Sequence, residues 1–143
     1  MNKILLLGAV ALLAATGMAR ADAPTPIEMR QTGLDLLAGS FGGIRAVVAA
    51  KGDVKTLESS AKAMARFAAI MPGLFPKGTE TGTKAKPEIW TDMEGFTKAA
   101  AALGAASTKL AELAKAGDAE GVEAQVKLVG AACAACHNGY RAK

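Results

Sequence analysis

Two cysteines and one histidine near the end of the chain have a spacing that suits covalent attachment of a cofactor. Cys133, Cys136 and His137 form the pattern Cys-x-x-Cys-His, and the 143 residues contain no other cysteine or histidine. On a helix, residues three and four positions apart share one face. The two thiols can therefore form thioethers to the two vinyl groups of one porphyrin, and His137 can be the axial ligand of its iron. The pattern predicts one covalently attached haem c.

Two other chemistries are open to a Cys-x-x-Cys pair. A disulfide or thiol-redox pair usually sits at the start of a helix in a strand–helix–strand context, whereas Cys133 follows an alanine-rich segment that favours a long helix. A structural zinc site needs about four ligands, and this chain offers one compact trio. Random placement of two cysteines and one histidine produces the haem pattern on the order of once in ten thousand arrangements. Haem attachment is therefore the preferred interpretation.

The first 21 residues have the features of a secretory signal peptide. A short polar start with Lys3 precedes an apolar run over residues 4–15, and Ala19-Arg20-Ala21 matches the small-x-small pattern of a cleavage site, with Ala21-Asp22-Ala23 as a second choice. The apolar run is shorter than the ~20 residues of a membrane span, and no later segment is apolar enough to span. We therefore expect cleavage after residue 21, export to the periplasm, and a mature chain over residues 22–143 without a membrane span. An uncleaved anchor is the alternative.

The mature composition predicts an all-α domain and does not favour nucleic acid. Removing Lys3 and Arg20 lowers the net charge from +4 to +2, and the remaining cations are scattered rather than gathered in a stripe. Aromatic residues make up only 4% of the chain, so a large apolar cofactor would help to fill the core. The sequence is rich in Ala, Lys, Glu and Leu and lacks the alternation of strands, which predicts helices.

Four helices can be drawn along the mature chain. The first two cover about residues 25–50 and 53–71, the third begins around Pro87 or Thr91 and runs to about residue 116, and the fourth covers about 118–141, with one long irregular stretch at 72–86. Two short connections and one longer one predict an antiparallel four-helix bundle, with the haem near the C-terminal helix. Leu57, Ala61, Met64, Phe67, Ala68 and Met71 should share the buried face of the second helix.

Several segments beyond the haem motif resemble the class II c-type cytochromes, and in particular the cytochrome c′ family. Met29-Arg30-Gln31 is similar to an aromatic-Arg-Gln stretch of that family's first helix. Gly78-Thr79-Glu80 and Lys86-Pro87-Glu88-Ile89-Trp90 resemble its long loop and the start of its third helix. Cys136-His137-Asn138-Gly139-Tyr140-Arg141 resembles its C-terminal segment.

The resemblance implies roles for three more residues. Arg30 corresponds to an arginine that reaches a haem propionate, and Arg141 to a basic residue beside the proximal imidazole. Leu34 corresponds to the apolar residue over the iron in cytochrome c′, where the electron-carrying relatives have methionine. The resemblance therefore implies five-coordinate, high-spin iron that binds NO or CO and can transfer electrons. Solvated arginines, or for Arg141 a simple cation at a helix end, are the alternatives.

A methionine ligand would change the function that the resemblance implies. Met29 lies five residues before Leu34, about 140° away around a helix, and Met64 and Met71 are expected to be packing residues. If one of them binds iron, the protein is a six-coordinate, low-spin electron carrier.

The sequence offers no acid–base pair beside the iron, so we expect no enzyme. An unidentified redox protein is the expected partner. The family also implies an antiparallel homodimer through the first two helices, where Gly39, Gly42 and Gly43 permit close contact.

Overall fold

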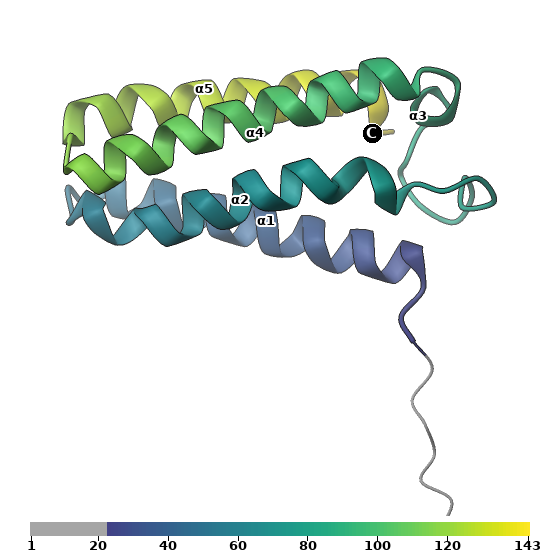
Figure 1. Ribbon diagram of the computed structural model, residues 1–143, viewed down its shortest axis with the longest axis horizontal. Coiled ribbons are helices and arrows are strands. Elements are labelled where there is room, and N and C mark those ends of the chain that lie inside the picture. The colour runs from purple at the N-terminus through teal and green to yellow at the C-terminus, as the bar shows by residue number, and fades with distance from the viewer. Residues whose placement is uncertain (1–22) are drawn as a thin grey trace, which may run out of the picture.

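The computed structural model describes residues 23–143 and has the predicted four-helix bundle. The helices are α1 (Pro26–Ala49), α2 (Glu58–Ile70), α4 (Met93–Ala116) and α5 (Ala119–Tyr140), with a short helix α3 (Glu88–Thr91) before α4. Figure 1 shows α4 beside α5 in one layer and α1 beside α2 in the other. The predicted signal peptide lies outside the described residues. No helix within residues 23–143 is long and apolar enough to cross a membrane.

Side-chain caps explain where the helices begin. Thr25 and Glu28 form a capping box at the start of α1, in which each side chain accepts from the other residue's backbone N–H. Asp118 accepts from Gly121 N at 2.9 Å at the start of α5. Asp92 accepts from Gly95 N at 3.0 Å, and this cap divides the predicted third helix into α3 and α4. The second helix begins with a 3₁₀ turn, η1 (Val54–Leu57).

Two helices end in the same motif with different residues at its left-handed position. After α1, Lys51 N donates to Val48 O and Gly52 N donates to Val47 O, so Lys51 has φ 53°. After α4 the equivalent position is Gly117, with φ 75°. This hydrogen-bond pair is the Schellman motif, which favours glycine at the left-handed residue. A lysine there carries a steric cost that glycine avoids.

We expect Lys51→Gly to stabilise the protein by about 0.5–1 kcal/mol, because the relief of left-handed strain exceeds the entropic cost of glycine. Guanidinium unfolding of the purified protein measures the change. The matched control is Gly117→Ala, which should destabilise because a Cβ at Gly117 would also lie 2.8 Å from Lys55 Cε. A Lys51→Gly protein no more stable than the wild type would contradict this account.

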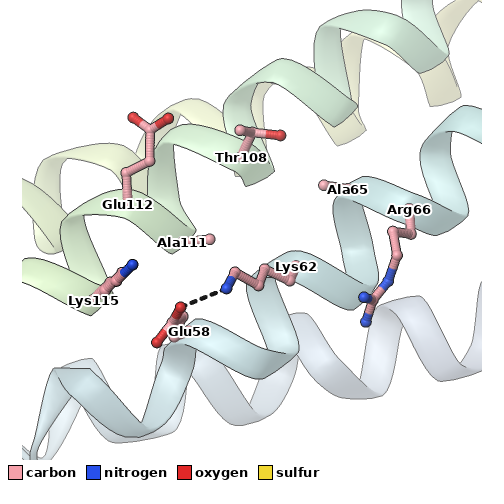
Figure 2. A pocket seen from close by; sticks show the side chains of 8 residues that line it. All are labelled: Glu58, Lys62, Ala65, Arg66, Thr108, Ala111, Glu112 and Lys115. Atoms are coloured by element: carbon pink, nitrogen blue, oxygen red, sulfur yellow. Dashed lines mark hydrogen bonds and ion pairs between the residues drawn. The ribbon is translucent and has the colours of Figure 1, made fainter.

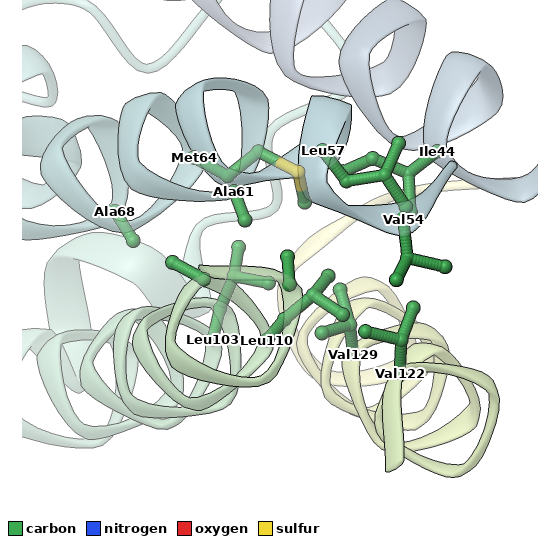
Figure 3. Packing of buried hydrophobic residues seen from close by; sticks show 12 residues of the cluster. Ile44, Val54, Leu57, Ala61, Met64, Ala68, Leu103, Leu110, Val122 and Val129 are labelled. Carbon is green, nitrogen blue, oxygen red and sulfur yellow. The ribbon is translucent and has the colours of Figure 1, made fainter. Parts of the chain in front are cut away.

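The core has two parts along the bundle. One cluster fills the middle and the end near the short turns. Figure 3 shows Ile44, Met64, Leu110 and Val129, one from each long helix, meeting there with Leu57 of η1. The second cluster lies at the other end and is built from Met71, Phe75, Ile89, Phe96 and Ala100. Of the face predicted for the second helix, Phe67 is half-buried and the other five residues are buried.

The long connection between α2 and α3 closes the second end of the bundle. It begins with a 3₁₀ turn, η2 (Met71–Leu74), and its later part pairs with the C-terminus. Lys86 N donates to Tyr140 O at 3.0 Å and Ala142 N donates to Lys84 O at 2.8 Å, around an antiparallel bridge between Ala85 and Arg141. The connection therefore fixes the end of α5, which carries the Cys-x-x-Cys-His motif.

Candidate functional site

The motif lies on the wall of a cavity between α1, α4, α5 and the long connection. The cavity has a volume of about 410 Å³. Its lining residues are Leu34, Asp35, Leu37, Ala38, Phe41, Met71, Phe75, Lys84, Ala85, Ile89, Phe96, Leu103, Cys133, Cys136, His137, Tyr140 and Arg141. Most of these side chains are aliphatic or aromatic, so the cavity suits a flat apolar group with charged side chains at its margin.

Helical spacing brings the three motif side chains onto that wall together. Cys133, Cys136 and His137 all belong to α5, and all three line the cavity. The thiols are free and half-buried. Desolvation raises the pKa of both thiols, and Cys133 further raises the pKa of Cys136. At neutral pH both are therefore protonated thiols rather than the thiolates of a reactive redox pair.

His137 is held in the form that can ligate a metal. Desolvation, and then the nearby Arg141, lower the pKa of His137, which favours the neutral imidazole. Two thiols, one neutral imidazole and apolar walls are the donors and surroundings that a covalent haem requires. The residues present therefore fit haem c: Cys133 and Cys136 would be its attachment points, and His137 would be the protein ligand of its iron.

Leu34 and one methionine line the same cavity as the motif. Leu34 is half-buried on α1, and Met71 in η2 is buried. The other methionines considered from the sequence lie elsewhere: Met64 packs in the first core cluster, and Met29 is 41% exposed. Phe41 and Phe75 line the cavity, whereas Phe67 does not and packs against the second core cluster. Met71 is thus the methionine that a six-coordinate alternative must use.

Arg30 is buried at the edge of this end of the bundle but does not line the cavity. Its Nη1 donates to Thr79 Oγ1 at 2.7 Å, and its Nη2 donates to Thr79 O at 2.7 Å and Thr83 Oγ1 at 3.3 Å. The guanidinium also lies 4.6 Å from the Phe75 ring centroid and 5.7 Å from that of Trp90. Arg30 therefore fastens the long connection to α1, while its role toward a haem propionate stays a prediction.

The end of α5 is held by contacts that the sequence did not indicate. Tyr140 lines the cavity, donates from its hydroxyl to Asp92 Oδ2 at 3.0 Å, and packs edge-on against Phe96. Its position three residues after His137 was the one available signal, because i and i+3 share a helix face. The pairing of Ala85 with Arg141 had no sequence signal. Together these contacts keep Arg141 on the cavity wall beside His137.

A second hollow, of about 400 Å³, lies between α2 and α4 and has a different character. Figure 2 shows small residues such as Ala65 and Ala111 between charged side chains, with Lys62 donating to Glu58. Lys62 Nζ and Glu58 Oε1 are 2.6 Å apart, and Lys115 also lines the hollow. None of the residues singled out from the sequence lies there, so the motif-bearing cavity is the candidate site.

Comparison with known proteins identifies the same kind of protein in sequence and in structure. A family model described as cytochrome C′ matches residues 25–141. The chain is 37% identical to cytochrome c-556 from Agrobacterium tumefaciens (strain B2A) over 122 residues, which span 82% of this chain and 97% of that protein. It resembles the atomic structure of a cytochrome c′ with an unusual ligand-controlled dimer dissociation, with TM-score 0.78 and 34% identity over 85% of this chain and all of that one. A nitric oxide complex of a mutant cytochrome c prime from Alcaligenes xylosoxidans gives TM-score 0.75 and 32% identity over 85% and 99%.

Proposed function

Because the chain belongs to the cytochrome c′ family, whose members carry one covalently bound haem c, we propose that it is a periplasmic gas-binding cytochrome with five-coordinate, high-spin iron. The observation that carries this proposal is the position of Leu34 in the lining of the cavity that also holds Cys133, Cys136 and His137. An aliphatic side chain cannot ligate iron, so it leaves the sixth position open while covering it. NO and CO are the ligands that we propose.

The chain's own residues divide the work at the site. Cys133 and Cys136 would hold the ring in place, and His137 would supply the single protein ligand from the proximal side. Arg141, which lines the cavity and lowers the pKa of His137, would keep that imidazole neutral and available. When bound, the haem supplies a one-electron couple and an open coordination position. Gas capture and electron transfer to a redox protein are therefore compatible at this site.

One observation favours a second candidate function. Met71 is 3% exposed and lines the same cavity as Leu34. A thioether can be the axial ligand of a c-type haem, where it raises the reduction potential. With Met71 as sixth ligand, the protein would be a low-spin electron carrier, closed to CO.

The absorption spectrum of the haem-loaded protein tests the two against each other. We expect a high-spin ferric spectrum, and a ferrous spectrum that shifts on addition of CO or NO, because Leu34 cannot ligate. Met71→Leu should leave both unchanged, as should Met64→Leu, the matched core control. A low-spin spectrum insensitive to CO, converted to high spin by Met71→Leu alone, would contradict gas binding and establish the electron carrier.

Two further parts of the proposal concern location and assembly. Export to the periplasm is supported by the family and by the signal peptide predicted at residues 1–21, and comparison of precursor and mature masses tests it.

A homodimer through α1 and α2 is supported by the exposure of Leu36 and Ile70, at 68% and 61%. Sedimentation velocity tests the dimer, and a species of monomer mass at micromolar concentration would contradict it.

A further inference from the structure

The ring of Phe67 lies directly on the backbone of Gly33, where α1 and α2 approach each other. A Cβ at Gly33 would overlap Phe67 Cε2 and lie 2.5 Å from Phe67 Cζ. Real Cβ atoms do not approach a ring so closely, so this contact is possible only with glycine at position 33. The other glycines of α1 differ: a Cβ at Gly39, Gly42 or Gly43 would have no atom within 4 Å. Gly33 is therefore the one glycine of α1 that helix packing requires.

The contact between Gly33 and Phe67 is next in sequence to Leu34, the residue proposed to cover the sixth coordination position. Leu34 follows Gly33 on α1 and points into the cavity, about 100° further around the helix. Leu34 and Phe67 both pack against the second core cluster, which includes Met71 and Phe75. A change in the spacing of α1 and α2 at Gly33 therefore moves the backbone that carries Leu34.

Packed interiors transmit such changes instead of absorbing them. Core side chains interdigitate at crystal-like density, so one added methyl group forces neighbouring groups to shift. The neighbour of Gly33 is the Phe67 ring on α2, and that ring packs against the second core cluster, which lines the cavity. Because the ring cannot easily move into this cluster, we expect an added Cβ at Gly33 to push α1 outward, away from α2. That movement withdraws Leu34 from the cavity.

We propose that the Phe67 ring seated on Gly33 is a positioning contact that sets how deeply Leu34 enters the cavity, and so determines how readily a diatomic gas reaches the iron. The inference rests on the proposed gas-binding function and adds two residues to it. Neither residue touches the gas: Phe67 does not line the cavity, and Gly33 has no side chain. Both act through Leu34.

The test is a double-substitution cycle on the haem-loaded protein, read by the CO association rate after flash photolysis. Gly33→Ala should raise the rate about tenfold, which corresponds to roughly 1.4 kcal/mol of barrier, because Leu34 withdraws. Phe67→Leu alone should lower it about threefold, because α1 can then move toward α2 and Leu34 enters the cavity more deeply. In the combined variant the added methyl group occupies the space left by the ring. Its rate should therefore return to within about twofold of the wild type.

A second readout and a matched control separate positioning from general destabilisation. Guanidinium unfolding of the same four proteins should show the same non-additivity, with the double variant more stable than the sum of the single losses predicts. Gly42→Ala adds the same methyl group and helix propensity to α1 where a Cβ meets nothing, so it should leave the CO rate unchanged.

The outcomes distinguish this inference from the proposed function. A wild-type protein that does not bind CO would overturn both. A wild type that binds CO, with Gly33→Ala and Phe67→Leu both within a factor of two of its rate, would overturn the inference alone. Single variants with altered rates and no recovery in the double variant would also overturn it. If Gly33→Ala fails to fold, Phe67→Leu still decides the question, because an unchanged rate in that variant contradicts the proposal.

Discussion

Replacing Cys133 and Cys136 together with alanine is expected to abolish covalent haem attachment completely. A thioether needs a thiol, and the chain has no third cysteine to substitute. The haem-dependent absorbance that remains with the protein after acid–acetone extraction measures attachment, and the intact mass confirms it. In the wild type the absorbance should stay with the protein, and in the double variant it should be lost to the solvent.

The same variant should lose cooperative folding, because the cavity would have no filling. At about 24 cal/mol per Å³ for cavities left in a packed core, 410 Å³ corresponds to an upper bound of about 10 kcal/mol. That is comparable with the whole stability of a domain, about 5–15 kcal/mol. Walls that collapse or admit water reduce the cost. We expect a helical chain, by far-ultraviolet circular dichroism, without a sharp thermal transition.

The matched controls for this variant lie between the cysteines. Ala134 and Ala135 are exposed, so Ala134→Ser and Ala135→Ser change the motif's spacer without changing its thiols or its spacing. Both should retain haem and a sharp transition. Haem that stays with the extracted double variant would contradict the assignment of these cysteines as attachment points.

The helices and the motif could be predicted from the sequence because their signals are local. The helix ends predicted at residues 50 and 116 and the starts predicted at 53 and 118 lie within one or two residues of the ends of α1 and α4 and the starts of η1 and α5. The third helix was expected to begin around Pro87 or Thr91, and the structure uses both places: α3 follows Pro87, and α4 begins at Met93 after the Asp92 cap. The division into two separate helices was not predicted. Fold class and helix order thus follow from spacing and caps alone.

The contacts around the cavity could not be predicted because they join distant segments. The pairing of Ala85 with Arg141 and the hydrogen bond from Tyr140 to Asp92 connect residues about 50 positions apart, and neither leaves a periodic pattern. Phe67 was predicted on the buried face of its helix, but its seat on Gly33 depends on the spacing of two helices. Leu34 was placed in the cavity through a family resemblance rather than through physics.

Arg30→Gln is expected to destabilise the haem-loaded protein by about 2–4 kcal/mol, because hydrogen bonds to a charged group contribute about 1.5–3 kcal/mol each and part of this loss is recovered by relaxation. Arg30 is 1% exposed, and it makes three hydrogen bonds to Thr79 and Thr83 and stacks on Phe75. Guanidinium unfolding measures the loss. Trypsin should also cut faster after Lys77 and Lys84, since the connection that carries them is released.

Two comparisons show whether Arg30 acts on the connection or on a haem propionate. Arg45→Gln removes an exposed arginine of α1 for which the structure shows no ion pair or hydrogen bond within residues 23–143, and it should change neither stability nor cleavage. A Thr79→Ala/Thr83→Ala variant keeps Arg30 but removes both hydroxyl acceptors, and it should reproduce about half of the loss if Arg30 holds the connection, since the Thr79 carbonyl acceptor remains. A threonine variant as stable as the wild type, beside a destabilised Arg30→Gln, would contradict the fastening role. The propionate predicted from the family resemblance would then be the candidate partner that accounts for the loss in Arg30→Gln, besides the Thr79 carbonyl.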